Sequence, residues 1–172
     1  PCDAQAVEAL ADARGGASPL ALRMALLLRG QSPCKVEAVM RRLRFSQKDT
    51  ALAARYLKAQ QDIACGAPDA FAAAQLGADA LDAARAAFAA LGDTAALHRA
   101  QALKRSLAGA PLSLKELAIS GEDLKPLFAQ RGIPMREMGG LLHMLWRMAV
   151  EKTAQNTREG LLAAARAWAD SL

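Results

Sequence analysis

Basic side chains are concentrated in one stretch of the sequence. Residues 23 to 60 contain nine Lys and Arg against two Asp and Glu, an excess of +7, whereas the whole chain of 172 residues carries +5. A local excess of this size attracts polyanions, and nucleic acid is the usual polyanion that proteins bind. A helix face that only meets solvent has the same composition, so charge alone leaves both interpretations open. The cations at the centre of this stretch are Arg41, Arg42, Arg44 and Lys48.

A second pattern suited to anions lies between residues 117 and 134, where Ser-Gly, Lys-Pro and Gly-Ile-Pro interrupt a helical sequence. A helix, a short glycine-containing turn and a second helix form a helix-hairpin-helix, in which backbone amides at the start of the second helix can bind a phosphate. We expect Pro134 to fix the entry to the second helix without the loss of a needed backbone donor. An αα-hairpin that only closes the fold has the same pattern. Arg131 and Arg136 flank the turn and would add side-chain charge to the same phosphate.

Nucleophilic and metal-binding side chains form no interpretable pattern. Cys2, Cys34 and Cys65 are about thirty residues apart, which matches neither a disulfide framework nor a zinc site. His98 and His143 have no Ser or Cys partner at an interpretable spacing. We therefore expect neither a catalytic residue nor a metal site in this sequence.

The composition that would position these residues is helical. Apolar residues make up 53% of the chain, but many are alanine, and Val, Ile and Thr together number only eleven. We predict an all-α protein. Neither a signal peptide nor a run of roughly eighteen uncharged apolar residues occurs, so we expect a soluble, cytoplasmic protein without a membrane partner.

Start and stop signals place the first helices. We predict helices over 3–14, from Pro19 with Ser18 as cap, from Ser32-Pro33, and from Gln47 to about Ile63 with Ser46 as cap. The helix "LALRMALLLRG" is apolar nearly all round and is expected at the centre of the core. In the next helix, the apolar stripe is expected to comprise Val36, Val39, Met40 and Leu43.

Alanine-rich helices are expected from 67 to 109, with breaks near Gly77 and Gly92. After Pro111 the composition changes, and glycine, proline and methionine become frequent. This change indicates a helical body over 1–110 and a small helical tail over 111–172.

In the tail, Ser113 to Glu116 fits a capping box that opens a short helix, and Asn156 is expected to cap the last helix. A longer helix is expected over 135–153. Gly139 and Gly140 interrupt that helix, where each costs on the order of 1 kcal/mol relative to Ala. We expect close packing of a neighbouring helix, or a bound strand of ligand, to explain them.

Several runs in this order and spacing resemble one family. They are "PLSLKELAISGEDL", "RGI", a glycine at 139, and "NTREGLL", preceded upstream by "ALRMALLL" and "LRFSQKD". Together they resemble the C-terminal part of bacterial class II tRNA nucleotidyltransferases, the CCA-adding enzymes. The resemblance covers residues 20 to 166 loosely and is most distinctive over 113 to 162.

The resemblance implies a division of labour. In that family, a separate N-terminal head uses Mg²⁺ with CTP and ATP to add CMP and AMP to the tRNA 3′ end, while the body and tail hold the tRNA. This chain begins at Pro1 and shows no Asp-x-Asp pair, so it looks like the body and tail alone. Leu28-Arg29-Gly30 stands where some relatives carry a His-Asp metal site.

The resemblance also assigns site residues. The cations Arg41, Arg42, Arg44 and Lys48 would contact the acceptor arm. The tail hairpin would lie towards the tRNA elbow through Gly132, Ile133, Arg136 and Gly139.

Two other functions remain compatible with the sequence. A tetratricopeptide-like protein-interaction module fits the small and large alternation near 80–103, although no second copy follows at the required period. A helix-hairpin-helix DNA-binding protein fits the turn at 132–134. The aromatic residues Tyr56, Trp146 and Trp168 could stack on bases, but rings at helical spacing are more often core.

Overall fold

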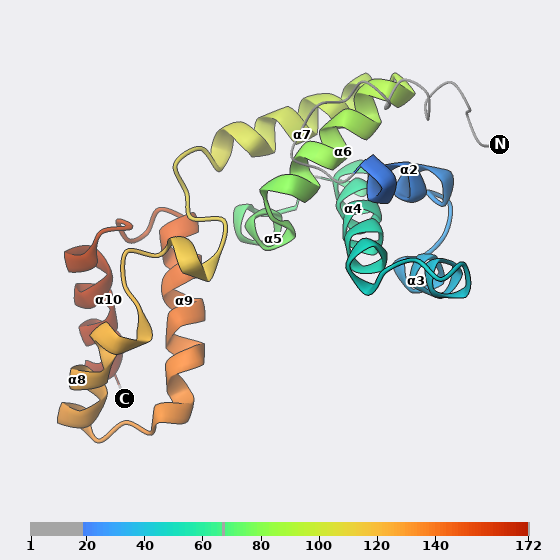
Figure 1. Cartoon of the computed structure of the whole chain (residues 1–172). Helices are drawn as coiled ribbons and strands as arrows, with labels where there is room; N and C mark the ends of the chain where they lie inside the picture. The colour runs from blue at the N-terminus through green and yellow to red at the C-terminus, as the bar shows by residue number, and fades with distance from the viewer. Residues whose placement is uncertain (1–18, 67, 172) are drawn as a thin grey trace. The chain divides into compact units, whose positions relative to one another are not determined.

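A computed structural model describes residues 19–66 and 68–171 (Figure 1). Within these residues all regular structure is helical, with nine α-helices, two short 3-10 turns and no strand, which confirms the all-α prediction. The helix expected over 3–14 and the Ser18 cap lie outside the described residues. None of the described helices has both the length and the apolar surface needed to cross a bilayer.

The chain divides into two compact units, Pro1–Ser106 and Leu107–Leu172. The sequence places the boundary after Ala110, four residues later than the division seen in the structure.

In the first unit, helix α4 is central and packs against α2, α3 and α6, with lighter contacts to α5 and α7 (Figure 1). Helix α4 is rich in alanine, and Ala53 and Ala59 are fully buried. Such small side chains let the neighbouring helices approach α4 closely. The helices of this unit are α2 (Pro19–Leu27), α3 (Pro33–Arg42), α4 (Gln47–Cys65), α5 (Ala70–Leu76), α6 (Ala78–Leu91) and α7 (Thr94–Ser106).

Hydroxyl caps fix the starts of α3 and α4 where the sequence predicts them. The Ser32 side chain accepts from the Lys35 amide at 3.4 Å, and the Ser46 hydroxyl accepts from the Asp49 amide at 3.0 Å. Each cap satisfies one amide that has no acceptor inside its helix. The Ser46 cap therefore fixes the point at which the turn between α3 and α4 ends and α4 begins.

Two packing predictions were wrong. Helix α2 buries a single face, and Leu20 and Leu27 remain 39% and 44% exposed, so α4 rather than α2 occupies the centre of the unit. Leu43 was expected on the apolar stripe of α3. It is 59% exposed because α3 ends at Arg42 and Leu43 forms its C-terminal cap.

The second unit is built around α9, which packs against α8, α10 and the first 3-10 turn (Figure 1). The apolar core includes Leu124, Phe128, Leu141, Leu145 and Leu161. The elements of this unit are η2 (Leu114–Glu116), α8 (Gly121–Arg131), η3 (Met135–Glu137), α9 (Met138–Val150) and α10 (Arg158–Asp170).

The capping residues expected in this unit have other roles. Ser113 to Glu116 forms a 3-10 turn instead of opening an α-helix, and the Glu116 carboxylate accepts from the Leu112 amide at 2.8 Å. Thr157 rather than Asn156 caps α10 by accepting from the Gly160 amide at 3.1 Å.

Asn156 instead links the segment just before α10 to Glu116 at the end of η2 and to Ala118. Its Oδ1 accepts from the Ala118 amide and its Nδ2 donates to the Glu116 carbonyl, both at 3.0 Å. The side chain thus satisfies one donor and one acceptor of an irregular segment that makes few bonds of its own.

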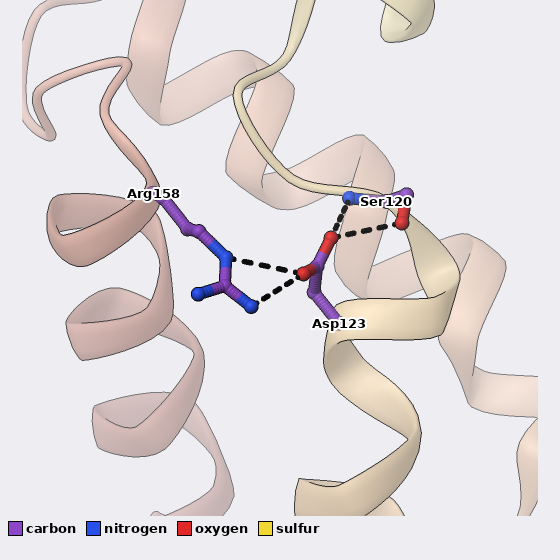
Figure 2. A network of polar contacts seen from close by, with 3 residues as sticks. All are labelled: Ser120, Asp123 and Arg158. Carbon is purple, nitrogen blue, oxygen red and sulfur yellow. Dashed lines mark hydrogen bonds and ion pairs between the residues drawn. The ribbon is translucent and has the colours of Figure 1, made fainter.

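A three-residue network supports the same junction, as Figure 2 shows. Asp123 accepts from the amide and hydroxyl of Ser120, each at 2.9 Å, and from the Arg158 guanidinium at 2.8 and 3.2 Å. The hydrogen bond from Arg158 and then those from Ser120 lower the pKa of Asp123 from 3.8 to about 2. Two of the runs that carry the family resemblance, "PLSLKELAISGEDL" and "NTREGLL", therefore bind each other through these hydrogen bonds and stabilise the second unit.

Candidate nucleic-acid interface

The cations expected to contact an acceptor arm gather at the turn between α3 and α4, which we call the basic corner and define as Arg41, Arg42, Arg44 and Lys48. All four are exposed. Arg41 forms an ion pair with Glu37 at 2.9 Å and keeps 72% of its side chain exposed. In the described part of the chain, Arg42, Arg44 and Lys48 have no carboxylate partner. The corner therefore carries uncompensated positive charge.

The start of α4 adds to this positive potential. Amides in the first turn of a helix have no intrahelical acceptor, and they form the positive end of the helix dipole. Asp49 in this first turn offsets part of the potential, and its carboxylate accepts a hydrogen bond from the Ser46 hydroxyl at 2.6 Å. A phosphate at this corner would meet Lys48 and the helix start together.

The backbone at the corner is unusual. Arg44 has φ +59°, in the left-handed region that glycine normally occupies. Its amide donates to the Arg41 carbonyl and the Phe45 amide donates to the Met40 carbonyl, both at 3.0 Å. These two bonds define a Schellman motif that ends α3.

Two further cations were missed as site candidates, although they lie in the same basic stretch. Arg29 and Lys35 are exposed and form no ion pair with any described residue. Lys35 lies seven residues before Arg42, two turns along the same face of α3. Not every cation of the stretch is available, because Arg55 pairs with Asp79, and Lys58 pairs with Asp62 at 2.7 Å. The i, i+4 spacing of Lys58 and Asp62 is visible in the sequence, whereas the pairing of Arg55 with Asp79 is not.

The tail hairpin joins α8 to α9 as expected, but its charges are compensated. Gly132 adopts φ +65° and ends α8, and the Ile133 amide donates to the Phe128 carbonyl at 3.0 Å. Arg131 forms an ion pair with Asp170, and Arg136 pairs with Glu137 at 3.4 Å. The hairpin therefore offers an anion less charge than the basic corner does.

The start of the second hairpin helix also differs from the expectation. The helix expected from Met135 begins at Met138 instead, and Pro134 precedes a 3-10 turn over Met135–Glu137 that leads into α9. The amides of Met135 and Arg136 head this turn, where the first amides have no acceptor inside the turn. The geometry is that of a hairpin with a tightened entrance to its second helix.

Gly139 and Gly140 are exposed on α9, and a Cβ built on either would meet nothing within 4 Å. The expected close packing of a neighbouring helix was therefore wrong. Arg136, in η3, comes four residues before Gly140, and Arg147, in α9, comes seven residues after it and pairs with Glu151 at 3.0 Å. A stretch of bare helix backbone thus lies between exposed basic side chains.

No group of three or more His, Cys, Asp or Glu suited to a metal ion occurs among the described residues. His98 is exposed on α7, and the His143 ring contacts the edge of Trp146 at 5.3 Å between centroids.

Comparisons of this chain with protein-family models, with curated proteins and with solved structures find no match. The link to CCA-adding enzymes consequently rests on the sequence resemblance.

Proposed function

We propose that this protein binds RNA through the sugar-phosphate backbone, with the basic corner as the principal contact. The observation that carries the proposal is the exposure of Arg42, Arg44 and Lys48 at the junction of two helices without a carboxylate partner in the described residues. Exposed charges of one sign that are not cancelled locally attract a polyanion and lose that attraction as salt rises.

Burial of the aromatic residues favours backbone contact over base recognition. Tyr56 and Trp146 are 1% and 7% exposed, and the Trp146 indole donates to the Pro111 carbonyl at 2.8 Å. Every other Phe and Trp in the described residues is buried or half-buried, Trp168 included. Proteins that read single-stranded bases present exposed rings for stacking, and this chain lacks such a platform in the part that the structure describes.

The finer form of the proposal is that the RNA is tRNA. The sequence resembles the body and tail of CCA-adding enzymes, and such an enzyme accepts every tRNA regardless of sequence. Recognition by backbone charge and shape suits that task, because an A-form helix exposes its phosphates and 2′-hydroxyls more readily than its bases. A separate head domain would supply Mg²⁺-dependent transfer from CTP and ATP.

A filter-binding titration of the chain with unmodified tRNA tests this function. We expect salt-sensitive binding, with the logarithm of affinity falling by about 0.7 to 0.9 per phosphate contact for each tenfold rise in salt. Duplex DNA of similar length serves as the competitor. Preference for tRNA supports the proposal, equal competition by DNA supports the helix-hairpin-helix alternative, and absence of tRNA binding at low salt refutes both.

A further inference from the structure

Two residues other than glycine have a left-handed backbone in the described part of the chain, and both are cations. Arg44 and Lys152 each have φ +59°. They occupy the same place in two helices, because the Lys152 amide donates to the Ala149 carbonyl at 3.3 Å and the Thr153 amide to the Met148 carbonyl at 2.9 Å. Lys152 thus ends α9 with the Schellman motif by which Arg44 ends α3.

Glycine fills the equivalent position elsewhere in this protein. Helices α6 and α8 end at Gly92 and Gly132, with φ +68° and +65°. In each helix the amide after the glycine donates to the carbonyl five residues earlier, at 3.0 Å. A side chain in the left-handed region is strained because its Cβ crowds the backbone. Glycine would therefore relieve strain at both cationic positions.

Contacts within the described residues do not explain why a cation stands there. Arg44 and Lys152 are exposed, and neither forms an ion pair with a described carboxylate. Glu151, next to Lys152, is already paired with Arg147 at 3.0 Å. A cation does complement the negative end of a helix dipole, but α6 and α8 end in the same way and have glycine.

We infer that Arg44 and Lys152 are phosphate-contacting residues, one in each unit, and that RNA binding is what retains a side chain at these two strained positions. Strained residues in proteins cluster at functional sites, where another gain offsets the strain. The inference rests on the proposed RNA-binding function. It adds a contact at the end of α9, which lies outside the hairpin and the basic corner.

The test replaces each residue with glycine in the full chain and measures stability and tRNA affinity separately. Both tryptophans, Trp146 and Trp168, belong to the second unit, so their fluorescence in urea follows Lys152→Gly, while far-ultraviolet circular dichroism follows Arg44→Gly. We expect each variant to unfold at a higher urea concentration and to bind tRNA about 3.8- to 5.5-fold more weakly near 0.15 M salt, with the salt slope reduced by about 0.7 to 0.9.

Matched controls separate local contact from net charge. Arg105→Gln in the first unit and Arg166→Gln in the second each remove one exposed cation that has no ion pair in the described residues, and we expect both to bind tRNA as the unchanged chain does. Arg44→Lys keeps the charge and the strain, so it should keep the affinity.

The outcomes distinguish this inference from the proposed function. Lower stability of the glycine variants would show that the cations serve the helix ends and would overturn the inference. Unchanged tRNA affinity of the glycine variants, with salt-sensitive binding by the unchanged chain, would overturn the inference alone. Failure of the unchanged chain to bind tRNA would overturn the proposed function as well.

Discussion

Replacing Arg41, Arg42 and Arg44 together with Glu tests the basic corner. All three side chains are exposed, and only Arg41 has an ion pair in the described residues, with Glu37. In Arg41→Glu, Glu37 would face a second carboxylate four residues away, which costs about 0.2 to 0.5 kcal/mol. The fold should therefore survive, and circular dichroism of the triple variant checks that it does.

The size of the effect follows from counterion release. Each phosphate contact contributes a salt slope of about 0.7 to 0.9, and this contribution vanishes near 1 M salt. At about 0.15 M salt, loss of three contacts weakens binding by about 50- to 170-fold. Charge reversal adds repulsion, so this range is a lower bound. The loss should be the same for all tRNAs, because phosphate contacts carry no sequence information.

A second triple variant controls for net charge. Arg105, Lys115 and Arg166 are exposed and have no ion pair in the described residues, so replacing all three with Glu changes the net charge by the same amount. We expect this control to weaken tRNA binding far less in the same filter-binding assay. Equal losses in the two triple variants, or no loss in the first, would refute the assignment of the corner.

Three further predictions concern the second unit and use tryptophan fluorescence in urea. Gly139→Ala and Gly140→Ala should each stabilise the unit by up to about 1 kcal/mol, because each Cβ enters open space on an exposed helix face; a lower urea midpoint would contradict this. Asn156→Ala removes two hydrogen bonds to the backbone and should destabilise the unit by about 1 to 3 kcal/mol, whereas a neutral result would mean that water replaces them. The pKa of Asp123 is lowered from 3.8 to about 2, so the stability it contributes is complete above pH 3.8 and is lost as the pH falls towards 2. Asp123→Asn should abolish that loss across this range, and an unchanged pH profile would show that the network does not stabilise the fold.

Helix starts in the first unit could be predicted because their signals are local. Ser32-Pro33 and Ser46 each place a hydroxyl and a favourable first turn within four residues, and the structure begins α3 and α4 there. Asn156 misled the same reasoning, since a side chain that suits a helix cap also suits a long-range bridge to residues 116 and 118. Tertiary contacts of this kind leave no periodic trace in the sequence.

The basic corner could be found from composition, whereas the state of each cation could not. Arg55 lies in the same basic stretch as Arg42, yet it forms an ion pair with Asp79. Asp79 lies twenty-four residues from Arg55, and only the packing of α6 on α4 brings the two together. Gly139 and Gly140 led to a wrong prediction of close helix packing. The sequence shows that a glycine lowers helix stability, but it does not show that the space beside these two residues is open.

Charge compensation also ranks the two surfaces that the sequence suggested. The hairpin arginines have acidic partners, Asp170 for Arg131 and Glu137 for Arg136, and a phosphate must compete with these carboxylates. At the basic corner, Arg42, Arg44 and Lys48 face no such competition within the described residues. Exposed ion pairs stabilise a protein by about 1 kcal/mol or less. Exchange of a carboxylate for a phosphate at the hairpin arginines would therefore change the free energy only slightly in either direction. The salt dependence of RNA binding should therefore arise mainly from the first unit, with the second unit contributing Lys152 and the exposed backbone of α9.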